Sequence, residues 1–100
     1  MARFLVTYRG GKPPANPEQA AAMAQAFGGW VAKSGKAIVD PGAPIHSVAQ
    51  VANGTPLPAA EIGGYSIIEA DTVEKAVAIL KTHPFVARGG TLQLHEPLTF

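Results

Sequence analysis

The sequence contains no cysteine and few charged residues, and both absences exclude classes of function. Without cysteine the chain can form no disulfide, no thiolate nucleophile and no cysteine-ligated metal site. Its eight Lys and Arg residues are nearly matched by seven Asp and Glu residues and are scattered, so no basic stripe indicates a nucleic-acid partner. No apolar run approaches the ~20 residues of a membrane-spanning helix, so we expect no membrane partner.

The low charge density also bears on assembly. Charged residues make up 15% of the 100-residue chain and hydrophobic residues 47%, whereas an average soluble domain is roughly 25% charged. A chain of this length forms one domain, residues 1–100, with a large surface for its volume. Because few polar groups are available to cover that surface, we predict a homodimer. The apolar run after Arg3 is too short for a secretory signal, so we expect a cytoplasmic protein.

The first third of the chain predicts a strand and a long helix. Residues 3–8 are largely β-branched or aromatic and are followed by two glycines, which is typical of a strand. Asn16 is a suitable N-cap before a proline, so we expect a helix from there to about residue 34. Gly28 and Gly29 do not disturb its apolar stripe, so the helix should be continuous, with glycines that allow close packing. The stripe consists of Ala20, Met23, Ala24, Phe27, Trp30 and Val31.

The remainder of the chain predicts further strands and a second helix. Strands are expected at residues 36–39, 46–52, 64–70 and 91–95. An Asp-Pro-Gly-Ala turn follows the first of these strands, and Asn53-Gly54 signals a tight turn after the second. Asp71 is expected to cap the second helix with Glu74 in the capping-box position, and Pro84 to end it.

This order of elements predicts an α+β fold. It corresponds to a ferredoxin-like βαββ(β)αβ sandwich, in which an antiparallel sheet carries two helices on one face. Such a sheet has a second, bare face. A sparsely charged chain is expected to cover that face with a second copy of itself, which gives a dimeric α+β barrel.

Several segments together carry a family resemblance. They are the first strand, Trp30 late in the first helix, residues 39–44, residues 63–71 and the turn at residues 84–90. The most specific piece is the Gly-Gly-Tyr strand followed by an acidic residue and a helix rich in alanine and valine. On these residues nearly the whole chain resembles the YCII-related family within the dimeric α+β barrel superfamily.

The resemblance implies a dimer whose two sheets face each other, with a cleft between each sheet and its helices. Relatives in the superfamily include cofactor-free monooxygenases, lactone isomerases and dehydrohalogenases, so it implies a small-molecule cleft with no cofactor. Better-known relatives carry a histidine on the first helix with an acid nearby, and this helix has none. The Asp-Gly-Pro-Phe motif of a large subgroup is replaced here by residues 53–56, Asn-Gly-Thr-Pro.

Asp40 and His46 are the candidate catalytic residues. They flank a rigid Pro-Gly-Ala-Pro turn that could hold them at a fixed separation. A carboxylate that orients an imidazole fixes its tautomer and raises its basicity, as a general base near neutral pH requires. In the alternative reading, Asp40 only bonds the turn backbone two residues on, and His46 is an ordinary loop residue.

The candidate substrate-binding residues are aromatic. Tyr8 and Tyr65 lie on strands that should be neighbours, so their hydroxyls could orient a ligand oxygen; the alternative is that they pack at the edge of the core. Trp30 lies on the helical stripe, where packing competes with substrate stacking. His83 is expected at a helix end, in contact with the helix dipole or exposed to solvent. Arg88 could meet an anion, or it could be a solvated loop residue.

Two functions are compatible with these residues. The first is a cofactor-free enzyme that transfers protons on a small organic molecule, by isomerisation or elimination. The second is a non-catalytic homodimer that binds a small ligand in the same cleft. The three histidines are not at metal-ligand spacing, so no metal is expected in either case.

Overall fold

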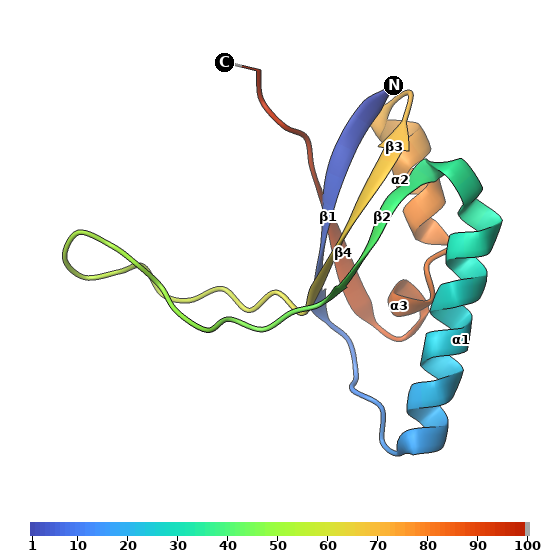
Figure 1. Ribbon diagram of the computed structural model, residues 1–100, viewed down its shortest axis with the longest axis horizontal. Helices are drawn as coiled ribbons and strands as arrows, with labels where there is room; N and C mark the ends of the chain where they lie inside the picture. The colour runs from blue at the N-terminus through green and yellow to red at the C-terminus, as the bar shows by residue number, and fades with distance from the viewer. Residues whose placement is uncertain (100) are drawn as a thin grey trace.

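The computed structural model describes residues 1–99, which form four strands, three α-helices and one short 3-10 helix (Figure 1). In chain order they are β1 (Ala2–Gly10), α1 (Pro17–Ser34), η1 (Gly35–Ala37), β2 (Ile38–Pro44), β3 (Gly64–Ala70), α2 (Val73–Lys81), α3 (Pro84–Ala87) and β4 (Gly90–His95). Among the described residues, no helix is both long enough and apolar enough to cross a bilayer.

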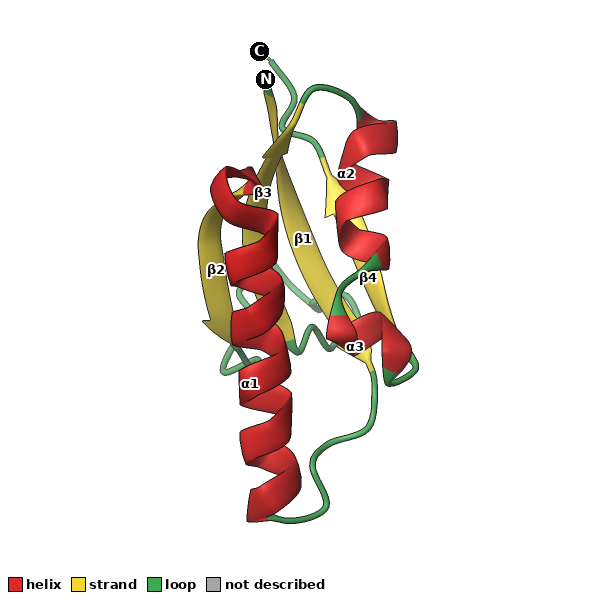
Figure 2. Cartoon of the chain, turned by 90° about the vertical axis from the view of Figure 1, so that its right-hand side faces the viewer, coloured by secondary structure: helices red, strands yellow, loops and turns green. Residues whose placement is uncertain are grey.

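The four strands form one antiparallel sheet in the order β2-β3-β1-β4. The helices lie together on one face of this sheet (Figure 2). The α+β class is therefore confirmed, and the strand order agrees with a ferredoxin-like arrangement. The central strand β1 pairs with β3 on one side and with β4 on the other, so its side chains are fixed from both edges.

The core lies between the sheet and the helices because alternate residues of β1 and β3 point to the helical layer. Phe4 and Val6 of β1 and Ile68 of β3 are fully buried there, against Trp30 of α1 and Leu80 of α2. Each large apolar side chain of this kind stabilises the fold by roughly 1.5–3 kcal/mol.

The strand expected at residues 46–52 is wrong. The chain from Ile45 to Gly63 has no regular structure and extends far from the sheet as an arm (Figure 1). A single described backbone bond, from the Ile45 amide to the Gly63 carbonyl oxygen at 3.1 Å, joins the two ends of the arm. Pro56 and Pro58 supply no amide donors, so the returning half of the arm cannot form a regular ladder with residues 46–52.

The helix caps agree with the sequence in one case and differ in the other. The Asn16 side chain accepts a hydrogen bond from the Gln19 amide at 2.8 Å, as expected. The expected Asp71 cap of α2 is wrong, because the N-cap is Thr72, whose side chain accepts from the Lys75 amide at 3.1 Å. Asp71 instead forms an exposed ion pair with the Lys75 ammonium group at 3.2 Å.

The glycines differ in how much space surrounds them for a side chain. Helix α1 continues through Gly28 and Gly29, as expected, but the predicted close packing is wrong, since a Cβ at either position meets no atom within 4 Å. Gly42 is the opposite case. Its φ of +76° is in the left-handed region, and a Cβ there would clash with the backbone carbonyl of Tyr65 on the neighbouring strand.

These environments predict opposite effects of the same substitution. Gly42→Ala should lower the free energy of unfolding by more than about 2 kcal/mol, because both the backbone angle and the contact with Tyr65 must change. Gly28→Ala should raise it by up to about 1 kcal/mol, because alanine is the better helix former at an open site. Urea unfolding of the two variants measures both effects. Equal stability of Gly42→Ala and the parent protein would contradict the close approach of β2 to β3.

Candidate functional site

A cavity of about 640 Å³ opens between the sheet and the helical layer, at the end where β1 leaves the sheet. Its volume is within the roughly 300–1,000 Å³ of small-molecule sites. Met23, Ala24 and Phe27 of α1 form one wall, and residues 41–44 at the end of β2 form another. The turn expected at Asp-Pro-Gly-Ala is wrong, because this stretch continues β2 with a bulge against β3. Most of the lining is apolar, and the polar side chains on the helical side of the sheet are few: Tyr8, Lys12, His83 and Arg88.

Phe85 of α3 is fixed by glycines on two sides of its ring. A Cβ at Gly11 would lie 2.8 Å from a ring carbon, and a Cβ at Gly90 would overlap the ring on another side. Both positions therefore need glycine while the ring stays where it is. The ring contacts Tyr8 with a centroid separation of 5.2 Å, so the floor of the cavity is largely aromatic.

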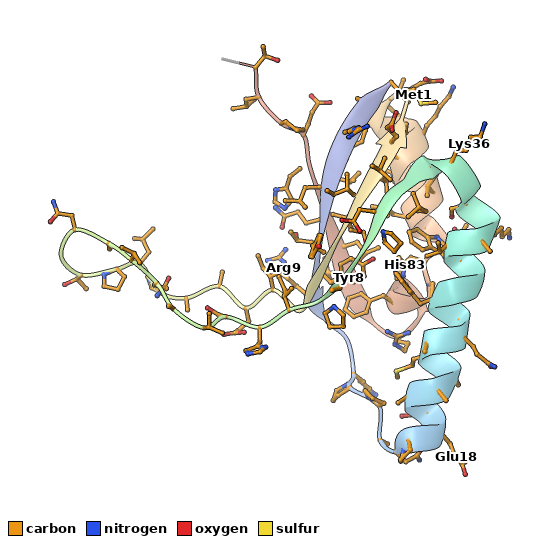
Figure 3. The ribbon with its side chains drawn as sticks, in the orientation of Figure 1. Met1, Tyr8, Arg9, Glu18, Lys36 and His83 are labelled. Carbon is orange, nitrogen blue, oxygen red and sulfur yellow. The ribbon has the colours of Figure 1, made fainter. Side chains whose placement is uncertain are left out.

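A chain of hydrogen bonds joins the helical layer to the sheet inside this cavity. His83 Nε2 lies 2.8 Å from the Tyr8 hydroxyl, which lies 2.7 Å from the Ser66 hydroxyl. Ser66 in turn donates to the Pro41 carbonyl oxygen at 2.7 Å. The labelled Tyr8 and His83 side chains meet between the sheet and α1 in Figure 3.

The direction of every bond in this chain follows from its two ends. The Pro41 carbonyl can only accept, so the single proton of Ser66 points to it and Tyr8 must donate to Ser66. Tyr8 therefore accepts from His83 Nε2–H. The other end agrees, because His83 Nδ1 accepts from the Phe85 amide at 3.0 Å and so carries no proton. The imidazole is neutral, with its proton on Nε2.

Burial and the direction of these bonds keep the network uncharged. His83 is only 3% exposed, and desolvation together with the positive charge of Arg88 lowers its pKa to about 4. Burial raises the pKa of Tyr8, and the hydrogen bond to Ser66 offsets this in part. At neutral pH the phenol is protonated and the imidazole is neutral, so both act as fixed dipoles rather than as charges.

His83 was expected at a helix end, in contact with the helix dipole or exposed to solvent. It does follow the end of α2, but it is buried, so exposure to solvent is wrong. It is the N-cap of α3 and is enclosed by aromatic rings, with the Trp30 ring at 4.2 Å and the Phe27 ring at 5.6 Å between centroids. Its spacing in the sequence could have indicated this, because His83 continues the stripe of buried residues Ala76 and Leu80 on α2. The sequence analysis did not predict α3, the short helix that directs the chain after His83 back to the cavity.

The structure places the candidate catalytic residues Asp40 and His46 in different settings. Asp40 Oδ1 accepts from the Gly42 amide at 2.8 Å, which is the local backbone bond of the alternative reading. His46 is exposed at the base of the arm. No hydrogen bond or ion pair joins the two side chains in the described part of the chain.

The three aromatic candidates differ in their position relative to the cavity. Tyr8 borders the cavity and carries its central hydroxyl. Tyr65 borders the cavity too, but it pairs with Thr7 in the sheet, so its side chain belongs to the helix-free face. Trp30 is buried in the core, where its indole Nε1–H donates to the Thr82 hydroxyl at 3.1 Å, and its ring contacts the lining residues His83 and Phe27.

Arg88 follows α3. The sequence left open whether it meets an anion or is a solvated loop residue. Its guanidinium carbon lies 5.5 Å from the centroid of the Phe85 ring, in a cation–π contact. Its Nε is buried and has no hydrogen-bond partner among the described residues. Arg88, Phe85 and His83 lie within one short stretch, so α3 and its flanks supply much of the polar chemistry of the cavity.

The described residues contain no group of three His, Asp or Glu side chains close enough to hold a metal ion. A scan of protein-family models matches none to this chain, and a search of curated proteins also finds no match. The site must therefore be interpreted from its own geometry.

The low pKa of His83 predicts a pH dependence of stability. The unfolded imidazole titrates near 6.5 and the folded one near 4, so the unfolded state binds the extra proton between these values. Stability should be constant above pH 6.5 on this account and fall as the pH drops towards 4, by up to about 3 kcal/mol.

Urea unfolding at several pH values tests this. His83→Gln should be less stable at pH 7 and should lose stability less steeply between pH 6.5 and 4 than the parent. His46→Gln, at an exposed histidine, is the matched control and should follow the parent curve. Parallel pH curves for His83→Gln and the parent would mean that His83 is not buried as a neutral group.

Proposed function

We propose that this protein binds a small, mostly apolar organic molecule in the cavity beside Tyr8 and His83. The observation that carries this proposal is the cavity itself, open at about 640 Å³ and lined mainly by apolar side chains. Apolar walls supply affinity and a few fixed polar groups supply orientation. The Tyr8 hydroxyl has one lone pair beyond its bonds to His83 and Ser66, and this lone pair can accept a hydrogen bond from the ligand.

Binding is favoured over proton transfer by the state of the imidazole. A general base needs an accessible lone pair and a pKa near the working pH. The lone pair of His83 Nδ1 is occupied by the Phe85 amide, and its pKa is about 4. Asp40 is held by the Gly42 amide and has no imidazole partner in the described residues. These features suit a site that holds a ligand without changing it.

One observation supports the cofactor-free proton-transfer enzyme as a second candidate. Tyr8 and His83 form a short hydrogen bond of 2.8 Å beside an apolar cavity, and such a pair can relay a proton if a ligand displaces the Phe85 amide. Tyr8 and His83 would then carry the chemistry, and Asp40 and His46 would join them only if a partner subunit brought them together.

We further propose that the protein is a homodimer of the dimeric α+β barrel type, as the resemblance to the YCII-related family implies. Two surfaces support this. All helices lie on one side of the sheet in Figure 1, so its other face carries no helix, and Leu5 on that face is 40% exposed. The arm from Ile45 to Gly63 exposes Val48, Val51 and Leu57 by 82% or more. Apolar side chains so exposed are best explained by packing against a second copy.

Ligand binding is tested by filling the cavity. Ala24→Phe places a large ring in the α1 wall and should reduce the affinity for 2-naphthamide at least tenfold, since the ring occupies the space of the ligand. Ala22→Phe is the matched control, because Ala22 lies on α1 but outside the cavity lining, and it should bind like the parent. Titration followed by backbone amide chemical shifts measures the affinity.

The same samples separate the two candidate functions. A proton-transfer enzyme should exchange an acidic C–H proton of a small ketone for deuterium in D2O, and Tyr8→Phe should abolish the exchange. A binding protein should leave the ketone unchanged. Equal affinity of both phenylalanine variants and the parent would show that the cavity is not the binding site.

Assembly is tested by sedimentation equilibrium at micromolar concentration. The parent should have about twice the chain mass of 10.3 kDa. Val48→Lys with Val51→Lys places charges on the arm and should shift the equilibrium towards monomers if the arm packs on the partner. Ala22→Lys, on an exposed position of α1, should leave the mass unchanged. A parent protein that sediments as a monomer would contradict the barrel assembly.

A further inference from the structure

The charges around the cavity are of one sign. Its lining contains two permanent cations, Lys12 and Arg88, and no Asp or Glu side chain among the described residues. The histidine of the lining, His83, is held neutral by burial, so it neither adds to nor cancels this charge. A largely apolar cavity with uncompensated positive charge favours a ligand that carries negative charge.

Arg88 is the cation placed to bind that charge. The guanidinium lies over the Phe85 ring at 5.5 Å from its centroid, which holds it at the aromatic floor of the cavity. Its buried Nε has no hydrogen-bond partner among the described residues. Because this donor has no partner there, a shift of the guanidinium towards a bound anion would cost it no hydrogen bond and could give it one. Lys12 is exposed at the mouth of the cavity and can attract an anion from solvent.

We propose that the ligand is a small organic carboxylate, whose apolar body fills the cavity and whose carboxylate pairs with Arg88. This rests on the proposed function and adds the chemical class of the ligand. The planar fork of a guanidinium matches a carboxylate with two parallel hydrogen bonds. A phosphate group would need more donors than one guanidinium in an apolar wall supplies. The hydrophobic side chains Met23 and Phe27 face the space where the body of the acid would lie.

The proposal also connects Arg88 to His83. Desolvation is the main cause of the low pKa of His83 and the positive charge of Arg88 adds to it, so an anion that neutralises Arg88 should raise that pKa above about 4 by removing the smaller contribution. Bound acid should therefore change the titration of His83, whereas a neutral ligand of the same shape should change it much less. This readout depends on where the charge lies, and not only on affinity.

The experiment compares 2-naphthoate with 2-naphthamide, which have nearly the same shape and differ in charge. At pH 7 and low salt the parent should bind the acid at least tenfold more tightly than the amide, as measured by calorimetry. Arg88→Gln should lower the affinity for the acid far more than the affinity for the amide, and so remove most of this preference. Arg88→Lys, which keeps the charge without the fork, should retain only part of the preference.

Arg9→Gln is the matched control, because Arg9 is an exposed arginine of β1 outside the cavity lining, and it should keep the full preference. NMR titration of His83 with saturating 2-naphthoate should show a raised pKa. Equal affinities for acid and amide in the parent, with Arg88→Gln unchanged, would overturn the carboxylate proposal and leave the binding function standing. Binding of neither compound at millimolar concentration would overturn both.

Discussion

The hydrogen bond between Tyr8 and His83 is the interaction on which the rest of the site depends. It joins the central strand β1 to the start of α3, and its partners Ser66 and Pro41 extend it across β3 to β2. Four elements are thereby tied at one end of the sheet. Because each group in the chain has a fixed donor or acceptor role, the arrangement has one orientation only, and protonation of His83 would break the bond from the Phe85 amide.

The cavity exists because the walls around this network cannot close. The bulged end of β2, residues 41–44, is stiffened by its prolines and held by the Asp40 side chain at the Gly42 amide. Gly11 and Gly90 leave room for the Phe85 ring, which would have to move if either position carried a side chain. An apolar space is thus kept beside a neutral hydrogen-bond network, with Arg88 as the charge closest to it. This combination supports a ligand with an apolar body and one acidic group.

The arm and the helix-free face of the sheet expose apolar side chains to solvent. The large apolar side chains of the core lie on the helical side of the sheet, while the arm extends away from the body with its valines in solvent (Figure 1). A chain with 15% charged residues has few polar groups to place there. The homodimer proposed above would cover both surfaces.

The sequence by itself determined the elements whose signals are local. The strand at residues 3–8, the Asn16 cap, the continuous first helix and the α+β order follow from periodicity, capping and turn residues, which act within a few positions of each other. The strand predicted at residues 46–52 is absent because a strand needs a hydrogen-bonded partner. The prolines in the returning half of the arm supply no amide donors for such pairing. Only the tertiary structure decided the site: α3 turned His83 and Arg88 onto the cavity, and the sheet register separated Tyr8 from Tyr65. The Tyr8–His83 hydrogen bond joins residues 75 positions apart, and no local pattern in the chain encodes it.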